Sequence, residues 1–318
     1  MIGGMPAPAI FAAPQVETEA PKRRRSRQLR IPEPHPIVKW AGGKGRVLPA
    51  LRAALPVSFG RYVEPFCGGA ALYFDLYTRG RLNTAEDARP VLCDLNVELI
   101  ETYAALAHDV EEVIAQLSSY ARRHATDAKG SYYATRNRFN DPVGELDLAD
   151  RAAAFLYLNR TCYNGLWRVN AKSGAFNVPM GDYKNPTICD PARLRMTARA
   201  LKRARILAGD YRTAIAFAQR GDFVYLDPPY DASFTQYTRG GFRAEDQETL
   251  AREAFALAER GVHVLLSNHD TPLVRELYPD CVWNVAEVSA PRAISSKGSS
   301  RGKVAELLIA NYRMGGVS

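Results

Sequence analysis

Strand-like and helix-like segments alternate along most of this chain, and this alternation constrains the fold more than any other feature. Seven short apolar runs have the length and composition of buried strands, and they cover residues 61–66, 91–94, 205–208, 223–226, 262–267, 283–288 and 304–310. Helical patterns separate most of these runs, at residues 70–77, 97–107, 246–259 and 272–277. The alternation predicts an α/β fold with a mostly parallel, doubly wound, seven-stranded sheet.

One interval breaks this rhythm. Residues 109–203 hold three helix-like stretches, followed by a polar segment rich in Gly, Asn and aromatic residues; the stretches cover 110–124, 131–139 and 148–158. We therefore expect a second domain at 109–203, inserted into a sheet domain that comprises residues 36–108 and 204–318.

The first 35 residues have the composition of a disordered basic tail. An Ala/Pro-rich stretch at 5–14 leads to the run 22–30, in which six of nine residues are cationic. The run is compatible with an arm that grips phosphates and equally with a solvated leader. It lacks the pattern of a secretory signal.

Charge and composition limit the partners. The net charge of +8 favours a polyanion, with nucleic acid as the leading candidate. No apolar run approaches the ~20 residues that span a bilayer, so we expect no membrane partner and a cytoplasmic location. The five cysteines are scattered without a close pair, which predicts neither a metal site nor disulfides.

The four residues Asp227-Pro228-Pro229-Tyr230 directly follow the apolar run 223–226. Two prolines fix the backbone and remove donors, so the chain leaves the strand along one rigid path. The Asp227 carboxylate and the Pro228 carbonyl can accept the two protons of an exocyclic amine, and Tyr230 can stack on the base. The motif predicts amine methylation, although so short a segment also occurs as a plain turn.

A glycine-rich turn follows the first strand-like run. Residues 64–69 read Glu-Pro-Phe-Cys-Gly-Gly and precede a helix, whose first N–H groups can face a ligand. Asp94 ends the next run, where an acidic side chain typically receives ribose hydroxyls. The dinucleotide pattern G-x-G-x-x-G is absent, which favours S-adenosylmethionine. Alternatively, Asp94 caps the helix that begins near Val97.

The segment Lys39-Trp40-Ala41-Gly42-Gly43-Lys44 lies upstream of this turn. Its glycines allow the backbone to fold closely over a small ligand, while the Lys44 ammonium reaches a carboxylate. The pattern of a nucleotide phosphate loop is incomplete, so we do not expect one.

Together these segments resemble the Dam-type, alpha-class DNA adenine N6-methyltransferases. The resemblance runs from Pro36 to Tyr312 and rests on six segments in the family's order, namely residues 39–44, 64–69, 94–96, 160–166, 176–179 and 227–230. It implies a Rossmann-like methyltransferase sheet with an inserted target-recognition domain of helices and a β-hairpin. It also implies S-adenosylmethionine as cofactor, double-stranded DNA as partner and no obligate protein partner.

The resemblance also assigns residues to roles. Those expected at the cofactor are Trp40, Lys44, Glu64, Phe66, Gly68, Asp94 and Asp227. Those expected at a flipped adenine are Asp227, Pro228 and Tyr230. Asp at the head of Pro-Pro-Tyr favours adenine over cytosine as the target.

Residues of the recognition segment are expected on DNA, namely Lys39, Tyr163, Asn164, Leu166, Arg168 and Pro179. An aromatic wedge and an arginine that can bond guanine with two donors suit this task. The alternative is that Tyr163 and Trp167 are core residues. A second basic loop, with Arg292, Lys297 and Arg301, is expected on DNA phosphates, although an exposed hairpin would look similar.

The sequence therefore predicts an enzyme that methylates adenine in a short palindromic duplex site, with GATC as the expected target. The chain departs from the closest Dam patterns at Trp167, at Val169 and in one extra residue before Phe176. These departures concern which DNA sequence is recognised, not the chemistry. Two other functions share these features: an RNA adenine N6-methyltransferase and a non-catalytic DNA-binding protein of the same fold.

Overall fold

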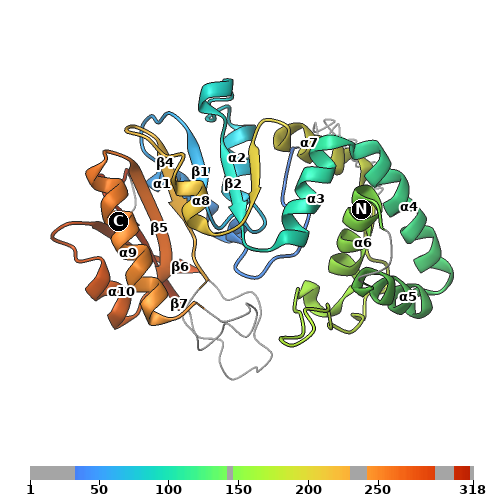
Figure 1. Cartoon of the computed structure of the whole chain (residues 1–318). Helices are drawn as coiled ribbons and strands as arrows, with labels where there is room; N and C mark the ends of the chain where they lie inside the picture. The colour runs from blue at the N-terminus through green and yellow to red at the C-terminus, as the bar shows by residue number, and fades with distance from the viewer. Residues whose placement is uncertain (1–32, 142–145, 230–241, 291–303, 316–318) are drawn as a thin grey trace, which may run out of the picture. The chain divides into compact units, whose positions relative to one another are not determined.

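All seven expected strands are present and form one sheet. The computed structural model describes residues 33–141, 146–229, 242–290 and 304–315. The strands are β1 Tyr62–Glu64, β2 Val91–Asp94, β3 Arg205–Ala208, β4 Phe223–Leu226, β5 His263–His269, β6 Asn284–Ala290 and β7 Val304–Ala310. Their order is β3-β2-β1-β4-β5-β7-β6, with the first five parallel and β7 antiparallel to both of its neighbours (Figure 1). The expected mostly parallel, Rossmann-like sheet is confirmed.

Both faces of the sheet are covered by helices, which explains why the central strands β1, β2 and β4 are buried along most of their length. In β4, Phe223 and Tyr225 join one core, whereas Val224 and Leu226 join the other. The first core is closed by α1 Leu48–Ala54, α2 Ala71–Thr78 and α3 Val97–His108. The second is closed by α8 Tyr211–Ile215, α9 Ala244–Glu259 and α10 Pro272–Leu277 (Figure 1).

Four further helices come from the interval between β2 and β3: α4 Val110–Thr126, α5 Ala128–Asn140, α6 Leu148–Thr161 and α7 Pro191–Leu201. Asp109, Asp127 and Asp147 cap the first three by accepting backbone N–H groups of the first turn. Helix α6 is buried along most of its length and packs against α3, α4 and α5. The core beneath α2 and α3 therefore continues into these helices, and residues from Pro32 onward form one compact unit.

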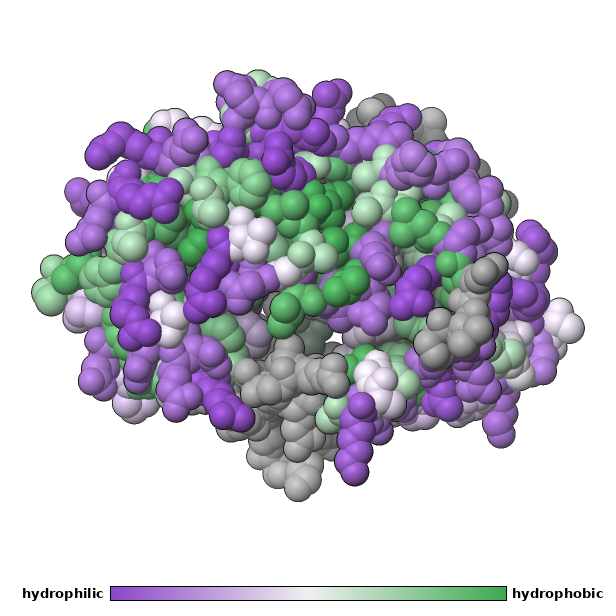
Figure 2. All heavy atoms as spheres, in the orientation of Figure 1, coloured by the Kyte–Doolittle hydropathy of each residue, from purple (hydrophilic) through white to green (hydrophobic). Residues whose placement is uncertain are grey.

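Polar side chains gather at the carboxyl ends of the parallel strands. Glu64 and Asp94 end β1 and β2, Asp227 follows β4, and Ser267 lies in the adjacent β5. Ligands of open α/β sheets bind at this edge. Figure 2 shows apolar side chains in a band across the middle of the face in view, with hydrophilic side chains around it.

None of the helices in the described part of the chain combines the length and apolar character required to cross a membrane.

Candidate active site

Asp227 is held by two donors on one oxygen. Leu226 pairs with Leu266 across the parallel strands, so the next residues, Asp227 and Ser267, are neighbours. Ser267 Oγ donates to Asp227 Oδ1 at 3.0 Å, and Lys44 Nζ lies 2.9 Å from the same atom. Charge-assisted contacts of this kind fix the orientation of a carboxylate.

Lys44 joins two distant parts of the chain at this point. It lies in the short 3-10 helix η1 Lys44–Arg46, and Nζ also approaches Glu306 Oε1 of β7 at 3.0 Å. Its side chain is only 7% exposed. Burial opposes the positive charge, but Asp227 and Glu306 outweigh this effect and raise the pKa of Lys44. The ammonium is therefore charged at neutral pH.

Two further hydrogen bonds hold the residues next to Asp227. The buried Tyr225 hydroxyl lies 2.9 Å from Ser267 Oγ in a hydrogen bond. Pro228 is buried, and the Pro229 carbonyl accepts from Gln247 Nε2 of α9 at 3.4 Å. Burial raises the pKa of Asp227, and Lys44 counteracts the rise. Tyr230, the expected stacking residue, lies outside the described residues.

The turn after β1 is tied to Asp94. Asp94 Oδ2 accepts from Gly68 N at 2.8 Å and Oδ1 accepts from Asn96 N at 2.9 Å. Burial raises the pKa of Asp94, while backbone N–H donors oppose the rise. Asn96 caps α3 by accepting from Leu99 N at 2.8 Å. The alternative that Asp94 is the helix cap is therefore wrong.

Gly68 is required by its contact with Trp40. Its φ of +44° lies in the left-handed region, and a Cβ there would come within 2.8 Å of Trp40 Cδ1. Tyr103 donates from its hydroxyl to the Gly68 carbonyl at 2.7 Å. The indole of Trp40 therefore lies directly against the glycine turn.

Two more of the expected cofactor residues flank this turn. Glu64 is 3% exposed, and its Oε2 has no hydrogen-bond partner among the described residues. Burial raises the pKa of Glu64 well above its ordinary value of 4.5. Phe66 is half-buried, with its ring stacked on Tyr211 at 5.2 Å and edge-on to Phe242 at 6.0 Å between centroids.

The segment after α6 presents side chains outward from a tight turn. In the 3-10 turn η3 Tyr163–Gly165, Asn164 and Gly165 have φ of +54° and +66°. Tyr163 N donates to Pro179 O at 2.9 Å, and the Tyr163 side chain is 50% exposed. Tyr163 is therefore not a core residue.

A short hairpin follows this turn. Val169 and Phe176 form an antiparallel bridge, and Asn177 N donates to Arg168 O at 3.1 Å. Arg168 is exposed, and its Nε donates to Asn177 Oδ1 at 3.0 Å. The Trp167 ring packs on Phe176, with centroids 4.3 Å apart, so the core alternative holds for Trp167. Leu166 packs against the core.

Comparison with known proteins decides the family. The chain matches the family model of D12 class N6 adenine-specific DNA methyltransferases over residues 40–294. The chain belongs to this class. The methyltransferase is 38% identical over 288 residues to the Type II methyltransferase M1.LlaDCHI of Lactococcus lactis subsp. cremoris, an alignment that covers 87% of the chain and 95% of that relative.

Two further relatives match at similar levels. The Type II methyltransferase M.MjaIII of Methanocaldococcus jannaschii is 38% identical over 296 residues, with 88% of the chain and 100% of the relative covered. The DNA adenine methylase of Escherichia coli K12 is 39% identical over 287 residues, with 89% and 96% covered. The protein is thus an adenine-specific DNA methyltransferase, which decides against the RNA-directed and non-catalytic alternatives.

The expected site residues of the methyltransferase form two groups. Asp227, Lys44, Asp94, Gly68 and Trp40 lie along the carboxyl edge of the sheet. Lys39, Tyr163, Asn164 and Pro179 lie around the turn after α6, with Arg168 on the hairpin beyond it. The basic loop with Arg292, Lys297 and Arg301 falls outside the described residues.

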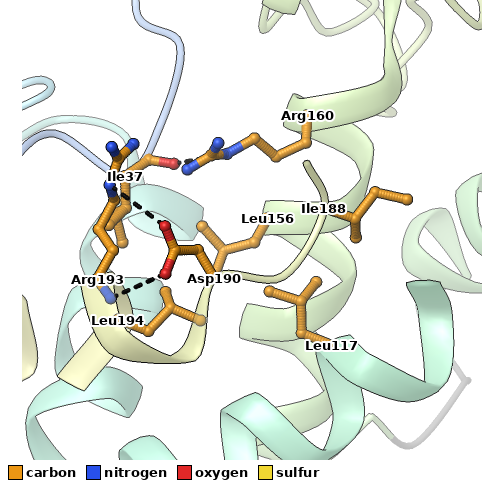
Figure 3. A pocket seen from close by; sticks show the side chains of 8 residues that line it. All are labelled: Ile37, Leu117, Leu156, Arg160, Ile188, Asp190, Arg193 and Leu194. Atoms are coloured by element: carbon orange, nitrogen blue, oxygen red, sulfur yellow. Dashed lines mark hydrogen bonds and ion pairs between the residues drawn. The ribbon is translucent and has the colours of Figure 1, made fainter. Parts of the chain in front are cut away.

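A small hollow lies among helices α4, α6 and α7, and its lining includes none of the residues around Asp227 (Figure 3). Its charged groups have partners in the structure. Arg160 Nε donates to the Ile37 carbonyl at 3.0 Å, and Asp190 caps α7 by accepting from Arg193 N at 3.1 Å. The hollow therefore belongs to the scaffold that holds the segment before Lys39.

Sequence reasoning missed three polar residues of this site. Ser267 ends an expected strand, and its position beside Asp227 depends on strand order and register. Glu306 is the one acidic residue in the apolar run 304–310, a signal that could have marked it. Asn159 is fully buried in α6 and bonds both Lys39 and Gly165.

Proposed function

We propose that this methyltransferase transfers a methyl group from S-adenosylmethionine to N6 of an adenine extruded from duplex DNA, with Asp227 at the reacting amine. The observation that carries the proposal is the fixed Asp227 carboxylate, bonded at Oδ1 by Lys44 and Ser267 and followed by two prolines. An adenine amine is a poor nucleophile, so positioning and polarisation by such a group are the chemistry required.

The residues at the carboxyl edge fit the proposed cofactor. The Oε2 of the buried Glu64, without a hydrogen-bond partner among the described residues, suits an ammonium group, and the glycine turn lets the Trp40 indole lie against the backbone at Gly68. Asp94 suits ribose hydroxyls, and Phe66 and Lys44 would complete the contacts. When bound, S-adenosylmethionine supplies an electrophilic methyl group on a sulfonium.

At the adenine, the chain would act through acceptors and stacking. The Asp227 carboxylate and the Pro228 carbonyl would each accept one amine proton, which turns the nitrogen lone pair toward the methyl donor. Tyr230 would stack on the base. Extrusion of the base costs on the order of a few kcal/mol, which contacts by Tyr163 and Asn164 would offset.

For recognition we propose residues 109–203 as the DNA-reading part and GATC as the site. Exposure of Tyr163, Asn164, Arg168, Pro179 and Lys39 supports this role. Leu166 would contact bases beside them, and Arg292, Lys297 and Arg301 would contact phosphates. Arg168 would read a guanine through two donors to O6 and N7.

Transfer of labelled methyl groups tests the proposal. Duplex DNA with GATC should be labelled, whereas duplexes with a permuted site and single-stranded RNA should not. DNA from cells that express the enzyme should resist a GATC nuclease that adenine methylation blocks. Active transfer together with full cleavage would rule out GATC, and unlabelled DNA in every duplex would overturn the reaction itself.

A further inference from the structure

The last turn of α6 ties together two segments that the proposed function places on different ligands. Asn159 is fully buried. Its Oδ1 accepts from Lys39 N at 2.8 Å, and its Nδ2 donates to Lys39 O at 2.9 Å and to Gly165 O at 3.3 Å. One side chain therefore bonds the backbone on the N-terminal side of Trp40 and the backbone of the turn after Tyr163.

Direct packing reinforces this connection. A methyl group on Gly165 would overlap Cβ and Cδ of Lys39, so the turn and the lysine stem are in close contact. The Lys39 ammonium lies 3.9 Å from the centroid of the Tyr183 ring and donates to Arg160 O at 3.4 Å. Arg160 in turn donates from Nε to Ile37 O, as Figure 3 shows. The segment from Ile37 to Lys39 is held by two consecutive residues of α6.

Trp40 carries the connection to the glycine turn. It is the next residue after Lys39, its indole lies against Gly68, and its ring lies 6.4 Å from that of Phe155 in α6. A single peptide bond thus separates the residue proposed to contact DNA from the residue proposed to contact the cofactor.

We propose that Asn159 is a positioning residue that couples cofactor binding to DNA binding. Cofactor contact with Trp40 fixes the backbone of Lys39, and Asn159 transmits this constraint to the turn that presents Tyr163. Each ligand then binds a chain that the other has already ordered, so each raises the affinity for the other by the same factor. The inference rests on the proposed function, because it takes the ligand assignments from there.

A thermodynamic cycle tests the coupling. The affinity for a GATC duplex is measured by fluorescence anisotropy with and without saturating S-adenosylhomocysteine, and the affinity for S-adenosylhomocysteine is measured by calorimetry with and without the duplex. In the wild type both ratios should agree, at about 10-fold. In Asn159→Ala both should fall to within about 2-fold of unity.

Asn311 provides a matched control. It makes the same pair of bonds to another main chain, accepting from Val264 N at 2.8 Å and donating to Val262 O at 2.8 Å. Asn311→Ala should lower the melting temperature as Asn159→Ala does but keep the full coupling factor. A merely structural role for Asn159 would leave the coupling equal in both variants, which would overturn the proposal.

A second variant tests the coupling if Asn159→Ala does not fold. Gly165→Ala, at the buried position of the turn η3, pushes the turn away from Lys39 and should also reduce the coupling. Two outcomes would contradict this inference and leave the proposed function intact. One is a folded Gly165→Ala protein with wild-type coupling, and the other is a wild-type enzyme that binds both ligands without coupling. A wild type that binds neither ligand would contradict the proposed function instead.

Discussion

A carboxylate bonded twice through one oxygen has little freedom to rotate, and Asp227 is held in this way by Lys44 and Ser267. The partners of this carboxylate come from distant parts of the chain: Lys44 precedes the first strand, Ser267 lies in β5, and Glu306 in β7 also bonds Lys44. The orientation of one side chain therefore depends on residues from three separate elements.

We expect Asp227→Ala to lower methyl transfer by about 10²–10³-fold or more, because it removes the acceptor that polarises the amine. DNA affinity should stay within a few-fold of the wild type, since Asp227 does not reach the duplex backbone in the proposed mechanism. Asp210→Asn is the control, because Asp210 follows β3 at the same sheet edge, where it caps α8 and pairs with Arg212. Transfer assays and anisotropy measure both; wild-type turnover in Asp227→Ala would refute the mechanism.

Ser267→Ala should lower kcat by about 3–10-fold with little change in KM for either substrate, because it removes one hydrogen bond that orients Asp227. Ser267→Thr keeps the hydroxyl and should restore activity. Steady-state kinetics at saturating DNA distinguish the two variants. Equal losses in the alanine and threonine variants would point to packing as the cause.

Glu64 predicts a pH dependence of stability. Its pKa is raised in the folded protein, so it keeps its proton at pH values where the unfolded chain has lost it. This contribution to the free energy of unfolding is complete below the ordinary pKa of 4.5 and is lost as pH rises through the folded pKa. Glu64→Gln cannot ionise, so its stability relative to the wild type should increase with pH. Urea unfolding from pH 4 to 8 measures this difference, and a flat difference would contradict the burial argument.

At the scale of elements, the central strands were predictable because each is buried on two faces and reads as one apolar run, whereas the edge strands β3 and β6 are partly exposed. The helices α2, α3, α9 and α10 were predicted from the sequence, whereas the short α1 and α8 were not. Helix α7 was not predicted, although the sequence marks its start with Asp190 as the cap and Pro191 at the first helical position. Motifs placed Asp227, Asp94 and Gly68 because each lies at a strand end or in the turn that follows one.

Neighbour relations between strands could not be read from the sequence in the same way. Ser267 meets Asp227 only because β5 is the neighbour of β4 in a particular register, and Glu306 reaches Lys44 only because β7 lies between β5 and β6. Strand order is set by the packing of the whole sheet, so no local pattern reports it. The role of Asn159 could not be predicted for the same reason, because its partner Lys39 lies 120 residues earlier in the chain.

The hairpin after α6 carries a prediction of its own. Arg168→Ala should weaken binding to the target duplex by about 1–3 kcal/mol and relax preference at one base pair, because the variant no longer offers two donors to a guanine. Lys172→Ala, at the exposed tip of the same hairpin, is the control. Competition binding with duplexes that differ at one position measures the effect. Equal weakening on all sequences would make Arg168 a phosphate-binding residue.

For the whole molecule, the relevant quantity is the distribution of its net charge of +8. Six cations lie in residues 22–30, upstream of the compact unit that begins at Pro32. The unit is anchored soon after its start, because Thr197 Oγ1 donates to His35 O at 3.3 Å. We therefore expect a deletion that ends at residue 31 to leave the catalytic unit unchanged.

Deletion of residues 1–31 should leave kcat at saturating DNA unchanged and lower DNA affinity at low salt. If these cations grip phosphates, the slope of log K against log salt falls by about 0.9 for each phosphate that the truncated protein no longer neutralises. Binding isotherms over a range of salt concentrations measure the slope. An identical slope in the truncated protein would leave the tail as a solvated leader.

The position of β7 also has a consequence for the timing of activity in the cell. Glu306 is translated long after Lys44, and the strand that carries Glu306 inserts between two strands made before it. A nascent chain still on the ribosome contains the glycine turn and Asp227 before the strand that bonds Lys44 has been made. Since a ribosome adds about 5–20 residues per second, on the order of tens of seconds separate the synthesis of Lys44 from that of Glu306, and the site is unfinished throughout this interval. Competence to modify the genome is thus acquired only after β7 has been made.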